Sequence, residues 1–227
     1  RDKDTGEKHY VPISSSRVNR YLSAFGHVCN IAVNEWEWLE DNPTRKISKL
    51  KEPRGRSRFL SKDERERLLS ACQNSFYQPL YLIVVLALST GMRKSEILNL
   101  RWADIDTSAG KIILHETKNG ERRLLPLTGY ALDLMVKHQK IRRIDTDMLF
   151  PSAKGDKPYE IKKSWEASLR EAKIEDFRFH DLRHSAASYF AMDGASTVEI
   201  ADILGHKTLQ MVKRYAHLSE AHTNKVV

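Results

Sequence analysis

The feature that most constrains the fold is an apolar stretch at residues 79–89, where Leu, Ile, Val, Ala and Tyr occupy nearly every side of a helix. A helix that is apolar all round has to be surrounded by other elements, so this stretch predicts the central helix of a core. Its uninterrupted part, residues 80–88, is too short to span a bilayer and lies far from the N-terminus. We therefore expect a globular protein without a membrane segment.

Helices dominate the rest of the pattern. Apolar residues recur at three- and four-residue spacing from Val18 to Trp36, which predicts an amphipathic helix that ends near Asp41. Ser61 and Glu64 have the spacing of a capping box and open a helix of about ten residues. Further helices are predicted at residues 93–98, 130–141, 161–172, 181–192, 197–204 and 208–215.

The strand signal is confined to one region. Two apolar runs, residues 111–116 and 123–127, flank an Asn119-Gly120 pair, and Asn-Gly is a preferred turn of a tight hairpin. Residues 104–106 are expected to add a third strand at the edge. The predicted fold is therefore mainly α (α+β), a helical domain that carries a small three-stranded antiparallel sheet.

Charge is distributed unevenly along the chain, whose net charge is +8. Residues 43–59 contain a single acid, Glu52, and seven basic residues: Arg45, Lys46, Lys49, Lys51, Arg54, Arg56 and Arg58. One interpretation is a solvated linker that happens to be basic. The other is a strap that lies along phosphates and makes binding salt-dependent. Cys29 and Cys72 lie in helical patterns, which favours buried reduced thiols and a cytosolic protein.

Five polar residues in the last two thirds of the chain have the chemistry of phosphate cleavage. They are Arg93, His180, Arg183, His206 and Tyr215. Arginines neutralise phosphate oxygens, histidines move protons or donate hydrogen bonds, and a phenol attacks phosphorus. Such a set can break a phosphodiester without a metal ion.

Each of these residues also has an ordinary structural interpretation. Arg93 can pair with Glu96 three residues later, and such a pair still leaves guanidinium donors for a phosphate. His206 can be a helix-terminal histidine, and most tyrosines are core or surface residues, so Tyr215 alone means little. Lys118, beside the hairpin turn, can reach a neighbouring groove or stay solvated.

A metal site is the alternative for the histidines. His180 and His184 are four residues apart, and His206 could supply a third ligand. The usual zinc motif, however, has glutamate where Asp181 stands, and Arg183 would repel a dication. We expect no metal, and we expect His184 to pack or hydrogen-bond internally.

Together these segments resemble the tyrosine recombinase family, the phage-type integrases and Xer-like recombinases. That family shows an arginine in a T-G-x-R-x-x-E context, a lysine on a β-hairpin, H-x-x-R, a histidine or tryptophan after L-G, and a tyrosine nine residues later. The matching residues, in chain order, are Arg93 with Glu96, Lys118, His180 with Arg183, Leu204-Gly205-His206, and Tyr215. The resemblance covers about residues 59–218, and its separated segments agree in order, residue type and spacing.

The resemblance implies a site-specific DNA recombinase that cleaves and rejoins DNA through a covalent 3′-phosphotyrosine, in integration or excision of mobile DNA. Arg93 and Arg183 would clamp the scissile phosphate, because each planar guanidinium can give two hydrogen bonds to one phosphate. Tyr215 would attack, with His180 as its base.

The remaining residues receive supporting roles from the same resemblance. Lys118 would protonate the departing 5′-oxygen, His206 would donate a hydrogen bond to the phosphate, and Glu96 would orient Arg93. Since the covalent link keeps the energy of the broken bond, no ATP, metal or other cofactor is expected. Relaxation of supercoils by a type IB topoisomerase, or DNA binding without catalysis, are the alternative functions.

The family also has a helical core-binding domain ahead of the catalytic one. We expect residues 1–52 to be a partial core-binding segment with the basic linker, and residues 53–227 to be the catalytic domain. The chain is read as a fragment of a longer protein, with only a short segment after Tyr215, where relatives often have a segment that docks on a neighbouring protomer.

The implied partner is double-stranded DNA, with no membrane involved. An oligomer, a tetramer, is expected on DNA during synapsis, and a monomer is compatible with this fragment. The expected location is the cytoplasm. A bacterial protein would be associated with the nucleoid there, and a phage protein would lie in the cytoplasm of its host.

Overall fold

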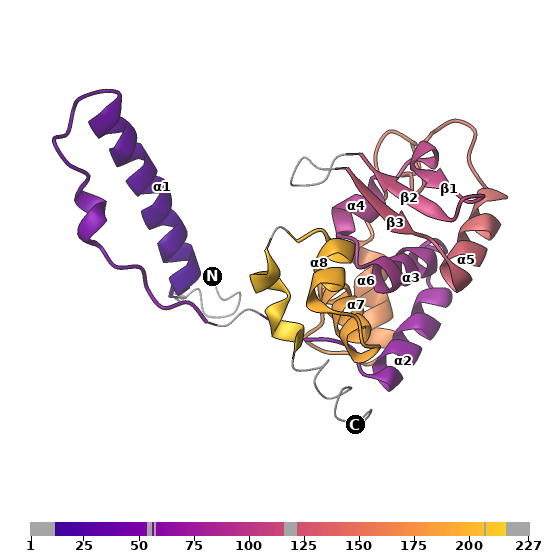
Figure 1. The fold of residues 1–227 in the computed structure, drawn as a ribbon. Helices are drawn as coiled ribbons and strands as arrows, with labels where there is room; N and C mark the ends of the chain where they lie inside the picture. Colours follow the sequence, from indigo (N-terminus) through magenta and orange to yellow (C-terminus); the bar gives the residue numbers. More distant parts are fainter. Residues whose placement is uncertain (1–11, 54–55, 57, 116–121, 207, 217–227) are drawn as a thin grey trace, which may run out of the picture. The chain divides into compact units, whose positions relative to one another are not determined.

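The computed structural model describes residues 12–53, 56, 58–115, 122–206 and 208–216 of the 227-residue chain. The chain divides into two compact units, Arg1–Arg56 and Ser57–Val227, and Figure 1 traces the elements of each. Within the described residues, no helix is both long and apolar enough to cross a bilayer.

The first unit is an α-helix with a returning segment tied to it. α1 spans Ser15–Asn34, and a 3₁₀ turn, η1, spans Pro43–Lys46. Asn42 donates from Nδ2 to the carbonyl of Gly26 at 2.9 Å, and Asn19 donates to the carbonyl of Leu50 at 2.8 Å. Because both amides are buried, they fix the path of the basic segment along the helix.

α1 ends earlier than the sequence predicts. The expected end near Asp41 is wrong, because the helix stops at Asn34 and Glu37 adopts a left-handed φ of 54°, which a helix cannot continue through. Cys29 and Ala32 of α1 are buried, but Tyr21 and Phe25 remain 58% exposed, so the apolar stripe of α1 is only partly buried.

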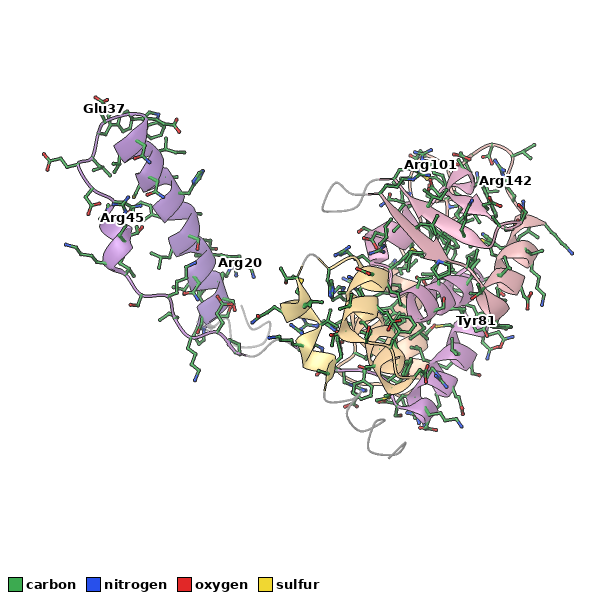
Figure 2. All side chains as sticks on the ribbon, viewed as in Figure 1. Arg20, Glu37, Arg45, Tyr81, Arg101 and Arg142 are labelled. Carbon is green, nitrogen blue, oxygen red and sulfur yellow. The ribbon has the colours of Figure 1, made fainter. Side chains whose placement is uncertain are left out.

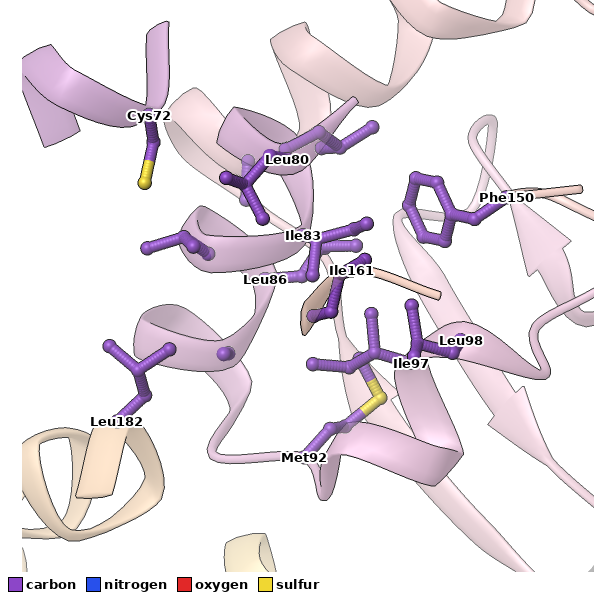
Figure 3. Close-up of a cluster of buried hydrophobic side chains, with 14 of the residues drawn as sticks. Cys72, Leu80, Ile83, Leu86, Met92, Ile97, Leu98, Phe150, Ile161 and Leu182 are labelled. Atoms are coloured by element: carbon purple, nitrogen blue, oxygen red, sulfur yellow. The ribbon is translucent and has the colours of Figure 1, made fainter. Parts of the chain in front are cut away.

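α3 (Leu80–Thr90) is the central helix of the second unit, as the apolar stretch predicts. The helices that pack against it most extensively are α2 (Lys62–Gln73), α4 (Lys94–Leu98), α5 (Gly129–Gln139) and α7 (Asp181–Met192). In Figure 3, Ile83 and Leu86 of α3 lie among side chains from other elements, including Ile97. Figure 2 shows side chains filling the interior of this unit.

The predicted capping box at the start of α2 is confirmed. Ser61 Oγ accepts a hydrogen bond from the Glu64 N–H at 3.1 Å, and the Glu64 carboxylate accepts from the Ser61 N–H at 2.9 Å. Two of the unpaired N–H groups at the helix start are thereby satisfied, which fixes where α2 begins.

The sheet has three short antiparallel strands, which confirms the predicted fold class. β1 (Ile105–Asp106), β2 (Lys111–Leu114) and β3 (Arg123–Pro126) lie in the order β1-β2-β3. Ile112 pairs with Leu125 on one side and with Ile105 on the other. The predicted Asn119-Gly120 turn lies outside the described residues.

The C-terminal part differs from the sequence prediction at one element. α6 (Lys162–Glu171) and α8 (Thr197–Leu204) are helices as expected, but the predicted helix at residues 208–215 is wrong. Two 3₁₀ turns stand there, η3 (Leu209–Met211) and η4 (Lys213–Tyr215). Since a 3₁₀ turn has three residues, it places Val212 and Tyr215 on one side, and both are buried against α7 and α8.

The end of α3 requires glycine at position 91. Gly91 has φ 63°, and a Cβ there would run into Leu204 of α8. We expect Gly91→Ala to lower the free energy of unfolding by about 2–4 kcal/mol, from left-handed strain plus overpacking. Gly129→Ala is the matched control, because Gly129 has φ 55° with nothing within 4 Å of a Cβ, and it should cost about 1 kcal/mol. Urea denaturation measures both, and equal losses would contradict the close approach of α3 to α8.

Candidate active site

Arg93 begins α4 directly after the Gly91 turn and is paired with Glu96. Its Nη1 donates to Glu96 Oε1 at 2.6 Å, and its backbone N–H donates to Oε2 at 2.9 Å. The Arg93 side chain is 23% exposed, whereas the Glu96 side chain is 7% exposed. The carboxylate therefore orients a guanidinium that is still partly exposed to solvent.

Arg183 comes from α7 and is bound by two backbone carbonyls. Its Nη1 donates to Gly91 O at 2.6 Å, and its Nη2 donates to Leu204 O at 2.5 Å. Both acceptors lie at helix C-termini, where carbonyl groups lack partners within the helix. The side chain thus joins the ends of α3 and α8, and the residue is only 4% exposed.

A third arginine, Arg123 of β3, completes the arrangement, and the sequence analysis did not single it out. Its Nη2 donates to Glu96 Oε2 at 3.0 Å, and its Nη1 donates to Leu204 O at 2.5 Å. The alternation of side chains along the strand could have indicated this residue, since Arg123 lies on the same inward face as the buried Leu125. An arginine at an inward strand position indicates a buried partner.

Arg93 and Arg123 therefore share the Glu96 carboxylate, and Arg123 and Arg183 share the Leu204 carbonyl, which links the three guanidinium groups into one cluster. Burial, and then the charge of Arg93, lowers the pKa of Arg183 to about 10. Burial opposes the ionisation of Glu96, but the Arg93 N–H and the Arg123 charge outweigh it and hold the Glu96 pKa below its usual value. The cluster carries more positive than negative charge, so an incoming phosphate would reduce the repulsion between the guanidinium groups.

His180 and His206 border this cluster. Burial, and then Arg183, lowers the pKa of His180, and the same two causes lower the pKa of His206 to about 4. Both imidazoles are therefore neutral at physiological pH. Among the described residues, His206 Nδ1 is buried and has no hydrogen-bond partner.

The hydroxyl of Tyr215 makes a hydrogen bond with His184 Nδ1. His184 therefore hydrogen-bonds internally, as expected, and its partner is the predicted nucleophile. Tyr215 is 4% exposed, and burial raises its pKa, opposed by Arg214 and Arg183. The phenol is protonated at neutral pH and lies within the field of the arginine cluster.

Within the part of the chain that the structure describes, Arg93, the most exposed member of the cluster, lines two of the clefts. One has a volume of about 610 Å³ and is also lined by His180, Lys94, Lys157 and Tyr159. The other has a volume of about 590 Å³ and is lined by Glu96, Arg101 and His115 among others. Lys94 in the first cleft is paired with Glu160 at 3.2 Å, so a polyanion that crossed Arg93 would meet Lys157 together with a cation that already has an acidic partner.

The other predicted site residues lie elsewhere. Lys118 and Arg54 are outside the described residues. Arg45, Lys46, Lys49 and Lys51 are exposed on the first unit. Arg58 belongs to the second unit, where its guanidinium pairs with Glu64 at 2.5 Å and lies over the Phe177 ring at 5.4 Å. Arg56 is partly buried and also has an interaction.

The described residues contain no group of three His, Cys, Asp or Glu side chains placed to hold a metal ion. His180 and His184 lie edge to face with ring centroids 5.4 Å apart, while His184 Nδ1 is engaged by Tyr215.

The chain belongs to the phage integrase family, whose sequence model matches residues 58–222. It is 38% identical over 208 residues to a shufflon-specific DNA recombinase of Escherichia coli, covering 91% of this chain and 52% of the relative. It is 31% identical over 224 residues to the integrase of Salmonella phage P22, covering 93% and 56%. The chain thus spans about half the length of these relatives.

Solved structures agree with this assignment. The catalytic domain of bacteriophage HP1 integrase is similar with a TM-score of 0.58 and 31% identity, covering 73% of this chain and 90% of that domain. The Tn1549 transposon integrase, solved with circular intermediate DNA, shares the fold with a TM-score of 0.72 at 21% identity, covering 95% and 81%.

Neutralising Glu96 tests the arginine cluster. Glu96→Gln leaves Arg93 and Arg123 without their carboxylate, so we expect the free energy of unfolding at pH 7 to fall by about 3 kcal/mol. Because the folded pKa of Glu96 lies below its ordinary value of 4.5, this stabilisation is fully present above that pH and is lost as pH falls through the folded pKa. The difference between the two proteins should therefore shrink in acid.

Denaturation at several pH values measures this effect. Glu160→Gln is the control, because it removes the carboxylate of an exposed ion pair with Lys94 and should change stability little. A pH-independent difference for Glu96→Gln would show that the carboxylate charge contributes nothing.

Proposed function

We propose that this chain is the catalytic part of a site-specific DNA recombinase that cleaves a strand with Tyr215 and holds the DNA end as a 3′-phosphotyrosine. The observation that carries the proposal is the convergence of Arg93, Arg123 and Arg183 with the Tyr215 hydroxyl near them. These side chains come from α4, β3, α7 and η4, so the fold assembles them from separated parts of the chain.

The arginines supply electrostatic stabilisation in this proposal. Arg93 is exposed enough to bind a phosphate oxygen directly, while Arg183 has one face fixed by the carbonyls of Gly91 and Leu204. Donors fixed before the reaction stabilise developing charge without reorganising, which is the largest catalytic effect available to such a site. His206 would donate to the phosphate, and Lys118 would protonate the 5′-oxygen.

DNA is the proposed partner. A shufflon-specific recombinase and phage integrases are among the relatives, and a neighbouring structure contains DNA. We assign residues 1–52 to the end of a core-binding domain, with the exposed Arg45, Lys46, Lys49 and Lys51 along phosphates. Strand exchange between two duplexes requires several protomers, which agrees with a tetramer on DNA. We propose a cytoplasmic location, at the bacterial nucleoid or in the host of a phage, because such DNA lies there.

Covalent capture tests the proposed function. The chain is incubated, in EDTA, with a pool of nicked duplexes whose central sequence is randomised, and protein–DNA adducts are isolated under denaturing conditions. We expect adducts that share a sequence, since a site-specific enzyme selects its site from the pool. The adducts accumulate because the nick lets the short fragment with the free 5′-hydroxyl leave, which prevents religation. Tyr215→Phe should bind the recovered duplex but form no adduct, since it lacks the attacking oxygen.

Tyr130→Phe is the matched control, because the Tyr130 hydroxyl contacts Tyr81 on the surface and should leave capture unchanged. Adducts formed by Tyr215→Phe would assign the nucleophile to another residue. Binding without any adduct from the unaltered chain would favour a DNA-binding module. Relaxation of plasmid without recombination of two sites would favour topoisomerase activity.

The salt dependence of binding tests the basic segment. Lys49→Ala with Lys51→Ala should reduce the slope of log affinity against log salt by about 2, one counterion for each lost phosphate contact. Lys137→Ala with Lys140→Ala, at the C-terminal end of α5 and directly after it, removes the same charge elsewhere and should leave the slope unchanged. Equal slopes for all three proteins on the recovered duplex would mean that the segment is a solvated linker.

A further inference from the structure

His184 stands where a proton acceptor for Tyr215 has to stand. It lies one helical turn after His180 on α7, and its Nδ1 makes the hydrogen bond with the Tyr215 hydroxyl. Tyr215 is fixed in this place because its ring is buried with Val212 and Leu204 in the cluster between α7, α8 and η4. The contact is therefore built into the packing of the domain.

His180 has a different position. Among the described side chains, the hydrogen bond of the Tyr215 hydroxyl is with His184, and the His180 ring lies edge to face with the His184 ring, with centroids 5.4 Å apart. His180 also lines the cleft beside Arg93, where a phosphate would enter. The two histidines thus face the two reacting groups separately, His184 the phenol and His180 the phosphate.

We propose that His184, rather than His180, receives the phenolic proton of Tyr215 when the tyrosine attacks the scissile phosphate. The inference rests on the proposed function and refines the role that the sequence gives to His180. The Tyr215 O–H bond breaks and its proton passes to His184 Nδ1, which requires the tautomer with hydrogen on Nε2. The tyrosine oxygen bonds to phosphorus, and the 5′-oxygen leaves with a proton from the acid, the role predicted for Lys118.

The charges around the pair keep the proton on the tyrosine until a phosphate arrives. Burial, then His180 and Arg214, lowers the pKa of His184 to about 4, while burial raises that of Tyr215. The titratable and charged groups that act on this pair are His180, Asp181 and Arg183 of α7, Arg214 of η4, and His206. A phosphate between the arginines offsets their charge, which raises the basicity of His184. Proton transfer is thereby linked to substrate binding.

The pH dependence of cleavage separates a proton acceptor from a merely structural contact. His184→Asn keeps an oxygen that can accept the hydrogen bond but cannot take up the proton. With the duplex recovered by capture, we expect single-turnover adduct formation to slow by about 100-fold or more near neutral pH. The variant then depends on preformed tyrosinate, so its rate should rise about tenfold per pH unit up to the tyrosine pKa.

His180→Asn is the matched variant one turn away, and it should lower the rate by the same factor at every pH. Thermal unfolding and affinity for the duplex verify that both variants are folded. An unchanged rate for His184→Asn, a pH-independent loss in it, or the tenfold slope in His180→Asn instead would overturn the proposal. Failure of the unaltered chain to form any adduct would instead overturn the proposed function, and the proton transfer with it.

The hydrogen bond itself can be measured without DNA. Nitrogen-15 NMR of the free chain reports the acceptor state of His184 Nδ1, and Tyr215→Phe should shift that resonance because the only change is loss of the hydroxyl. Tyr130→Phe should leave it in place. An identical Nδ1 resonance in the unaltered chain and in Tyr215→Phe would show that the contact is absent and would overturn the proposal.

Discussion

The carbonyl of Leu204, at the C-terminus of α8, holds the site together. It accepts hydrogen bonds from Arg123 at 2.5 Å and from Arg183 at 2.5 Å, while Arg183 also binds Gly91 O at the end of α3. The last carbonyl groups of a helix lack partners and carry partial negative charge. Two helix ends thus offset part of the cost of placing like charges next to one another in a buried site.

This arrangement makes the site depend on packing as well as on charge. The Leu204 side chain lies against the position where a Gly91 Cβ would stand, and Gly205 leaves room for the Arg123 guanidinium. A shift of α8 would move both arginines and His206, because all three are attached to the end of that helix. The small cluster of α7, α8 and η4 therefore sets the geometry of the phosphate contacts and the location of Tyr215.

Much of the fold could be predicted because its signals are local. The apolar stretch at residues 79–89 gave the central helix, and the Ser61–Glu64 spacing gave the start of α2. The residues of the proposed site could also be selected, and Arg93, Glu96, Arg183 and Tyr215 lie near one another in the structure. Where their side chains point could not be read from a motif.

The errors and omissions arose where long-range contacts decide. Two 3₁₀ turns stand at residues 209–215 in place of the predicted helix, and the apolar spacing could not distinguish the two, because Val212 and Tyr215 share a face in either structure. Arg123 was overlooked because its partners, Glu96 and Leu204, lie 27 and 81 residues away. The contact between His184 and Tyr215 spans 31 residues, and only the packing of η4 on α7 creates it.

The use of main-chain oxygens to bind Arg183 has a consequence for how this site tolerates sequence change. Every amino acid supplies a carbonyl, so no substitution at position 204 can delete the acceptor that both arginines share. An amino acid of similar shape there would preserve the anchor, whereas the guanidinium groups have no such substitute. The positions that donate, Arg123 and Arg183, are thus limited by the chemical identity of the side chain. The position that accepts, Leu204, is limited only by side-chain volume and backbone conformation.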